Sequence, residues 1–173
     1  LLRAIHKGTG RVKDWLGLKE KQSLFRREQL RQVLFMLSDE SPDDFLENVK
    51  ELLESKDVRF HLKHLVLEVV AQIQKPKRSL FGYLLRLWND PFWHTHISST
   101  VFHGQPQYVE FLIGEGLMSR LFDSKEEGDR NTARWLVYSV AEKIPDAVTG
   151  LLSPYMSKGG EWPQLVFGSL CWN

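Results

Sequence analysis

The chain contains very little cysteine and no long apolar segment. Among its 173 residues only Cys171 carries a thiol, so an internal disulfide cannot form, and we predict a reducing location such as the cytoplasm. No apolar run approaches the roughly 20 residues that a membrane-spanning helix needs, so we expect no membrane partner. Hydrophobic residues make up 42% of the chain and charged residues 26%, which is typical of a folded globular domain.

Sequence motifs that mark common enzymes are also missing. The chain has no G-x-S-x-G, no H-E-x-x-H and no paired-cysteine site. Residues 8–13 contain two glycines but lack the third glycine of a dinucleotide site and the Gly-Lys-Ser/Thr of a phosphate loop. Gly114-Glu115-Gly116 indicates only a loop or a kink, and Cys171 is better explained as a core side chain than as a nucleophile. We therefore predict that the chain is not an enzyme and has no cofactor and no small-molecule substrate.

Histidines near the middle of the chain suggest a metal site at first sight. In a helix His94 and His96 would point about 200° apart, and His96 and His103 would lie about 10 Å apart. Neither pair could share an ion at about 2.1 Å per bond. A second set, on one face of an expected helix, comprises His61, His64 and Glu68. Neighbouring members of this set could share a metal. A solvated polar face is the simpler interpretation. We predict no metal site.

Charge is distributed unevenly along the chain. Residues 1–31 carry nine basic and three acidic side chains, a balance of +6, whereas the remainder carries fourteen basic and nineteen acidic ones, a balance of −5. The basic segment could meet an acidic neighbour or a phosphate. A solvated surface is the simpler interpretation.

Two stretches, residues 52–73 and 121–144, are nearly the same. Each begins with two apolar residues, an acid and Ser-Lys, and each then carries an arginine, Arg59 or Arg130. Each ends on an apolar ladder, which finishes at Ile73 in one and 71 residues later, at Ile144, in the other. Shifting the first ladder back by 36 residues aligns it with a further apolar set: Leu30, Val33, Leu34 and Leu37. The forward shift matches weakly, which indicates a repeat of about 36 residues with one degenerate copy.

The ladder has the spacing of an amphipathic helix, i, i+3, i+4, i+7 and i+8. A similar helix precedes it after a very short turn, so the two helices must run antiparallel. Proline follows each ladder closely and suits the first turn of the next helix. We predict no strands, a connector at 1–21 with a short helix at 12–18, and a single helical-repeat domain at 22–173. Its helices are expected at 22–38, 43–54, 58–73, 78–89, 92–103, 106–122, 129–144, 146–157 and 163–173.

This arrangement resembles HEAT repeats. Asp57-Val58-Arg59 is close to the D-x-V-R that opens the second helix in that family, and Asp129-Arg130 keeps part of it. The middle copy, Asp90-Pro91-Phe92-Trp93, keeps only the aspartate. The resemblance covers residues 22–173 and implies an all-α fold, a right-handed α–α superhelix of antiparallel helix pairs.

A weaker resemblance is to the helical arm that follows the nucleotide-binding module in large bacterial STAND-type ATPases. It rests on residues 29–34, on Leu52-Leu53 and on residues 59–67. The resemblance implies a sensor or regulatory arm of a larger ATPase, although this chain contains no phosphate-binding module. Because the chain begins with Leu1 and ends within an apolar pattern without a stop signal, we expect it to be a piece of a longer protein.

The chain holds six tryptophans, and two of them flank an expected helix turn, Asn89-Asp90-Pro91. Aromatic residues at such a turn could anchor a partner, while packing between repeats is the alternative. We predict these partner-binding residues: Trp88, Trp93, His94, Arg59 and Arg130.

The function that we expect is a protein-interaction or regulatory arm of a multidomain protein. Its partner would be another protein or another domain of the same chain. The alternative is nucleic-acid binding, as in the HEAT-like glycosylases. It would need a basic stripe along the second helices, but those helices mix Arg59, Lys63 and Arg130 with acids, and the balance of −5 argues against it.

Overall fold

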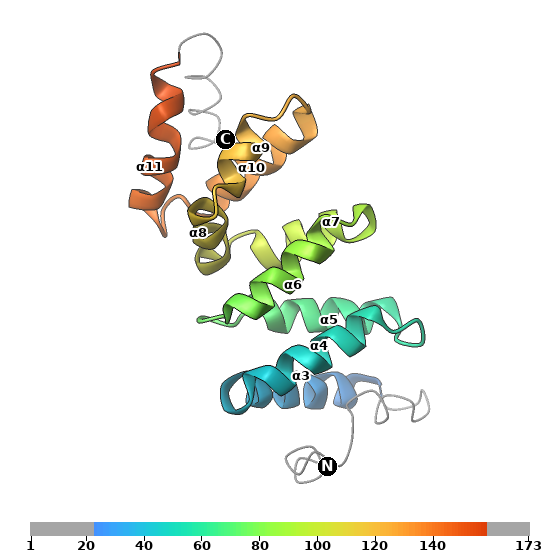
Figure 1. Ribbon diagram of the computed structural model, residues 1–173. Helices are drawn as coiled ribbons and strands as arrows, with labels where there is room; N and C mark the ends of the chain where they lie inside the picture. Colours follow the sequence, from blue (N-terminus) through green and yellow to red (C-terminus); the bar gives the residue numbers. More distant parts are fainter. Residues whose placement is uncertain (1–22, 159–173) are drawn as a thin grey trace. The chain divides into compact units, whose positions relative to one another are not determined.

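The computed structural model describes residues 23–158, and all the regular structure in that range is helical (Figure 1). No strand occurs among these residues, which confirms the all-α prediction. The elements are α3 (Ser23–Glu40), α4 (Pro42–Glu54), α5 (Phe60–Ala71), α6 (Arg78–Trp88), α7 (Pro91–Ile97), the π-helix η2 (Ser98–Phe102), α8 (Pro106–Gly114), α9 (Leu117–Phe122), α10 (Glu127–Val140) and α11 (Pro145–Met156). The connector at 1–21 with its short helix, the helix expected at 163–173 and Cys171 lie outside the described residues. No described helix is long and apolar enough to cross a membrane.

The chain divides into two compact units between Leu84 and Leu85, within α6. In the first unit α3, α4 and α5 each contact the other two (Figure 1). In the second unit α8 and α10 contact each other, η2 and α9, while α7 contacts η2 and α11 contacts α8. The prediction of a single repeat domain over 22–173 stays a prediction.

Proline determines where several of these helices begin. Pro42, Pro91, Pro106 and Pro145 occupy the first turn of α4, α7, α8 and α11. A proline there loses no helical hydrogen bond, because the first N–H groups of a helix have no partner inside it. Pro76 differs from this rule, since it lies two residues before α6 begins.

Two predicted helices are interrupted in the structure. The continuous helix expected at 106–122 is wrong, because α8 ends at Gly114 and α9 begins at Leu117. Gly116 between them has φ of +69°, a left-handed conformation that glycine adopts without strain. The helix expected at 92–103 changes at Ser98 from α to π geometry, with His103 N donating to Ser98 O at 2.9 Å.

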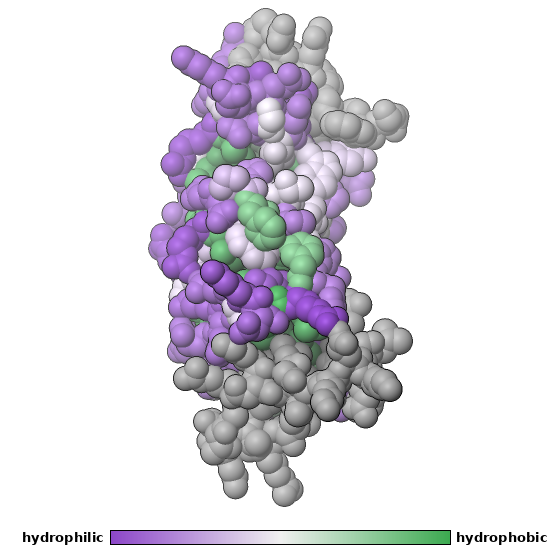
Figure 2. Space-filling model, turned by 90° about the vertical axis from the view of Figure 1, so that its right-hand side faces the viewer, coloured by the Kyte–Doolittle hydropathy of each residue, from purple (hydrophilic) through white to green (hydrophobic). Residues whose placement is uncertain are grey.

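The apolar ladders form the core, as their spacing predicted. Leu65, Val66 and Val69 of α5 are at most 2% exposed. The same holds for their counterparts in α10, Leu136, Val137 and Val140, and the aligned residues of α3 are also buried: Leu30, Val33 and Leu34. On the face drawn in Figure 2, hydrophilic side chains cover most of the described surface and hydrophobic ones are exposed at a few places.

Candidate partner-binding corner

The turn between α6 and α7 gathers aromatic side chains within the second unit. We call this group the aromatic corner: Trp88, Phe92, Trp93, His94 and Phe102. Trp88 ends α6, the next three residues lie in α7 and Phe102 ends η2. Asp90 begins α7 by accepting a hydrogen bond from Phe92 N at 2.8 Å, so it fixes the first turn of that helix.

Trp88 is the fixed centre of the aromatic corner. Its side chain is only 5% exposed, and its Nε1 donates to the buried Ser98 Oγ at 2.8 Å. Its ring meets Phe102 edge to face, with centroids 5.4 Å apart and an angle of 78° between the planes. Because the indole N–H is satisfied inside the protein, burial of Trp88 leaves no unpaired donor.

His94 is held against Trp88 by two contacts. The rings stack with centroids 5.2 Å apart and an angle of 10°. His94 Nδ1 also lies 3.0 Å from the Trp88 backbone oxygen. A carbonyl oxygen can only accept, so Nδ1 carries a proton, and in the neutral ring Nε2 is then an acceptor. The half-buried His94 is therefore fixed in both position and tautomer.

Phe92 is the exposed member of the aromatic corner. Its side chain is 60% exposed, whereas the neighbouring Trp93 is only 8% exposed. The two rings meet edge to face with centroids 5.1 Å apart. Phe92 therefore presents apolar surface to solvent on a rigid aromatic base, which is the form that binding anchors at protein interfaces take.

The structure brings together three of the predicted binding residues and separates the other two. Trp88, Trp93 and His94 lie in the aromatic corner, but both tryptophans are buried and can act on a partner only through their neighbours. Arg59 is exposed at the start of α5 in the first unit. Arg130 is half-buried in α10, where its Nη1 donates to Ser124 O at 2.7 Å and to Lys125 O at 2.9 Å. Partner binding by these five residues stays a prediction.

Sequence reasoning missed Phe92, although the helical pattern contains the signal. The buried positions Trp93, Ile97 and Val101 follow one another at intervals of four residues and form the inward stripe. Phe92 lies about 100° away from Trp93 around the helix, on the side where solvent is expected. An aromatic residue off the buried stripe, at the first turn of a helix, is a candidate surface anchor.

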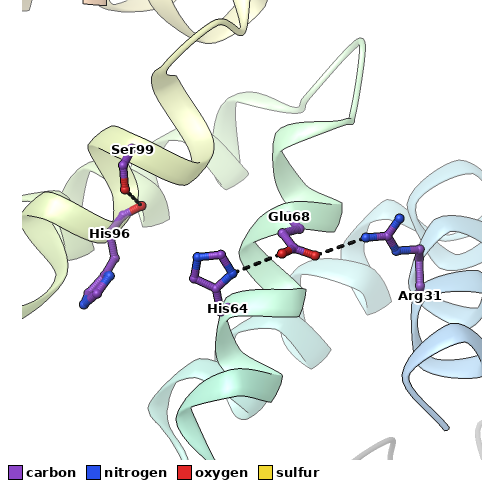
Figure 3. A network of polar contacts seen from close by, with 5 residues as sticks. All are labelled: Arg31, His64, Glu68, His96 and Ser99. Atoms are coloured by element: carbon purple, nitrogen blue, oxygen red, sulfur yellow. Dashed lines mark hydrogen bonds and ion pairs between the residues drawn. The ribbon is translucent and has the colours of Figure 1, made fainter. Parts of the chain in front are cut away.

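The polar residues of α5 contribute to packing within the first unit (Figure 3). Glu68 Oε2 accepts from Arg31 Nη2 of α3 at 3.1 Å, and Glu68 Oε1 lies 3.2 Å from His64 Nδ1. Glu68 thus links two helices through an ion pair whose members are about one-third exposed. The sequence placed His64 and Glu68 on one polar face, but it did not identify Arg31 as their partner.

His103 belongs to a second aromatic contact of the second unit. Its ring stacks on Trp135 of α10 with centroids 4.1 Å apart. Burial lowers the pKa of His103 below its usual 6.5, and the nearby positive charge of Lys143 lowers this pKa further. The next residue, Gly104, has φ of +73° and donates from its N–H to Ser139 Oγ at 2.8 Å. This contact fixes the end of η2 against α10.

Among the described residues no three His, Cys, Asp or Glu side chains lie close enough to hold a metal ion. The aromatic corner offers apolar surface and one oriented imidazole. Comparison of the chain with protein families, with curated proteins and with solved structures finds no match. The function must therefore be inferred from the residues and contacts themselves.

Proposed function

We propose that this chain is a non-enzymatic protein-interaction arm built from HEAT-like repeats of about 36 residues, arranged as a right-handed α–α superhelix. Its partner is another protein or another domain of the same, longer chain. In that longer protein the arm acts as a sensor or regulator, and the weaker resemblance suggests an ATPase as the regulated enzyme. Nucleic-acid binding stays the less favoured alternative, because the residues after position 31 have a balance of −5.

Support for the repeat comes from the sequence separation of residues that touch. Arg31 bonds Glu68 at a separation of 37 residues, and Gly104 bonds Ser139 at a separation of 35. Further bonds span 34 to 39 residues: Lys77 to Asp43, Lys143 to Gly104, Tyr155 to Ser119, and Lys158 to Asp123. These separations match one repeat length. Contacts between adjacent repeats are what a solenoid requires, since each repeat buries its apolar face only against its neighbours.

Support for the interaction role comes from the exposure of Phe92. A phenylalanine that is 60% exposed leaves a large apolar surface in water. The Phe92 ring meets the buried Trp93 at 5.1 Å and His96 at 5.8 Å, so it rests on other rings of α7 while one side faces water. The exposure of Phe92 on this fixed base is the observation on which the interaction proposal rests.

Site-specific photo-crosslinking of the full-length parent protein in its host cell tests the proposal. A photoreactive benzoyl-phenylalanine replaces Phe92 in one variant and Phe60, which is 43% exposed on α5, in a matched control. We expect position 92 to give one discrete product, identified by mass spectrometry as another protein or as another domain of the same chain. Position 60 should give little of that product.

A second variant connects the crosslink to the geometry of the aromatic corner. Replacing Ser98 by Ala removes the acceptor of Trp88 Nε1 and loosens the packing of Trp88 against His94 and Phe102 in the aromatic corner. We expect the crosslinked product at position 92 to decrease in this background. Absence of a discrete product at position 92, or equal yields at 92 and 60, would contradict the interaction proposal.

A further inference from the structure

Phe92 and Asp90 place an exposed aromatic ring beside an exposed carboxylate at the start of α7. The Phe92 side chain is 60% exposed, and Asp90 is exposed as well. Asp90 Oδ1 accepts from Phe92 N at 2.8 Å, so the carboxylate is held against the backbone of the residue that carries the ring. Because helical side chains lean toward the N-terminus of their helix, the Phe92 ring leans toward the end of α7 where Asp90 lies.

The Asp90 carboxylate has one described partner, and that partner is uncharged. Its hydrogen bond to Phe92 N uses Oδ1, and the described residues give Asp90 no ion pair, not even with Arg86 four residues earlier. Two other exposed aspartates differ in this respect, since Asp43 pairs with Lys77 and Asp123 pairs with Lys158. Asp90 therefore keeps a negative charge that no described side chain neutralises.

The Phe92 ring rests on two other rings of α7. It meets Trp93 with centroids 5.1 Å apart and an angle of 86°, and it meets His96 at 5.8 Å with an angle of 59°. A phenyl ring that was covered on both faces could not be 60% exposed, so part of a ring face is open to water. The face of an aromatic ring carries partial negative charge and attracts a cation within about 6 Å.

The side chain that suits both the ring and the carboxylate is an arginine. A guanidinium group is planar and weakly hydrated, so it can lie on an aromatic face, and its fork of N–H donors matches a carboxylate. A lysine ammonium is a strongly hydrated point charge and matches the ring less well. Residues 85–158 of the second unit carry seven basic and nine acidic side chains, a balance of −2, so the charge of this unit does not oppose a basic partner.

We propose that Asp90 and Phe92 form a recognition site for an arginine that a segment of another protein presents. The guanidinium lies on the open part of the Phe92 ring and donates to the Asp90 carboxylate. Asp90 Oδ1 keeps its bond with Phe92 N, and Oδ2 accepts from the arginine. This inference rests on the proposed function, because it names the chemistry by which a partner protein binds beside the aromatic corner.

NMR titration of the full chain tests the arginine chemistry without the partner. The probes are N-acetyl-arginine amide and N-acetyl-citrulline amide, which has nearly the same shape but no charge. We expect only the arginine compound, at millimolar concentration, to shift the amide signals of Phe92 and its neighbours. Asp90→Asn keeps a good N-cap and should weaken this binding by about two- to fivefold, the contribution of an exposed ion pair. Asp146→Asn, which removes the same charge from the first turn of α11, is the matched control and should change nothing.

Photo-crosslinking of the full-length parent protein in its host cell identifies the arginine. Benzoyl-phenylalanine replaces Thr95, which is exposed and lies three residues after Phe92 on the same side of α7, so the Phe92 ring is retained. We expect mass spectrometry to find the attachment point in another protein, within a few residues of an arginine. Asp90→Asn should lower the yield, and Asp146→Asn should not. Phe92→Leu keeps an apolar side chain without a ring and should also lower the yield, which separates cation binding from simple apolar contact.

Several results would overturn the arginine site. One is equal shifts with the arginine and citrulline compounds, because the charge is then not recognised. An attached segment without arginine, or a yield that Asp90→Asn leaves unchanged, would also exclude the site, while a discrete product at position 92 would leave the interaction proposal standing. Attachment to this chain itself would contradict an arginine on another protein. Absence of any product at both 92 and 95 would instead contradict the interaction proposal, on which the arginine site rests.

Discussion

The two similar stretches, 52–73 and 121–144, both contain a turn followed by a helix, but they stabilise the turn with different polar residues. In both turns the serine hydroxyl accepts from the N–H two residues later, Ser55 from Asp57 and Ser124 from Glu126. The chain then diverges, because Arg59 is the N-cap of α5 whereas Arg130 lies inside α10, which begins at Glu127. The turns thus begin alike and enter their helices differently.

Different cations bond the carbonyl groups near the two turns. Lys63 Nζ donates to Leu53 O at 2.7 Å in the first stretch. Arg130 Nη1 donates to Ser124 O and Lys125 O in the second. Carbonyl groups at the end of a helix lack partners inside the helix and need an outside donor. The requirement is therefore for a donor at this place, and either lysine or arginine can supply it.

Corresponding positions on the two ladder helices also make corresponding contacts. Glu68 of α5 and Ser139 of α10 are 71 residues apart, which is the offset of the ladders. Glu68 bonds Arg31, and Ser139 bonds Gly104. An ion pair in one unit is thus replaced by a neutral hydrogen bond in the other. The buried ladder is conserved between the stretches because packing constrains volume, whereas a polar link can be made by several residue pairs.

Truncating the ladders should have the largest effect. Leu65→Ala and Leu136→Ala each remove a buried side chain, and we expect each to lower the free energy of unfolding by about 2–5 kcal/mol. Urea denaturation measures both variants against the parent. If thermal denaturation places both variants within a degree of the parent, the alignment of the two stretches is wrong.

The two lateral links should differ in strength. Ser139→Ala leaves the Gly104 N–H without this partner, at a cost of about 1–2 kcal/mol. Glu68→Ala breaks a partly exposed ion pair, for which we expect about 0.2–1 kcal/mol. Ser99→Ala is the control, because the Ser99 hydroxyl of η2 donates to carbonyls of the adjoining α7, at 2.8 and 3.4 Å, and these bonds span only three or four residues. A larger loss for Glu68→Ala than for Ser139→Ala would reverse the expected order.

The stacked histidine should make the second unit sensitive to acid. Because the pKa of His103 is lowered in the folded state, the unfolded chain takes up a proton at higher pH than the folded one. The stability from neutral His103 is therefore complete above pH 6.5 and is lost as the pH falls through the lowered pKa. His103→Phe should flatten this dependence in pH-dependent denaturation. His61→Gln, at an exposed position, is the control, and an unchanged slope in His103→Phe would exclude the stacked ring as its source.

The smallest expected effect concerns the affinity for duplex DNA, because the basic first 31 residues are offset by an acidic remainder. We expect no tight binding of duplex DNA by the full chain at about 150 mM salt, because phosphate contacts weaken steeply as salt rises. Gel-shift titration measures this directly. Sub-micromolar affinity with a steep dependence on salt would favour the nucleic-acid alternative.

Local patterns predicted the helices and much of their core. Proline at a helix start and apolar residues at i, i+3 and i+4 act within one or two turns, so helices could be predicted at 43–54 and 58–73, where the structure has α4 and α5. The break at Gly116 was visible only as a loop or kink signal. Its consequence, two helices in place of one, depends on a left-handed φ that many glycines never adopt.

The candidate site was predicted only in part. The sequence identified Trp88, Trp93 and His94 as candidates, but it left open whether the two tryptophans are buried, and it missed Phe92. Whether a ring is covered depends on the residues that fold against it. For Trp88 these include Ser98 and Phe102, which η2 places beside it.

The sequence by itself determined the helical class, the positions of most helices and the burial of the ladders, because these follow from the spacing of apolar residues and from proline geometry. Tertiary structure alone decided which polar residues pair across about 36 positions and that both Trp88 and Trp93 are buried. The physical reason is the sequence distance over which each interaction acts. Helix formation responds to neighbours within a few residues, whereas burial and hydrogen bonding are decided by segments that only folding brings into contact.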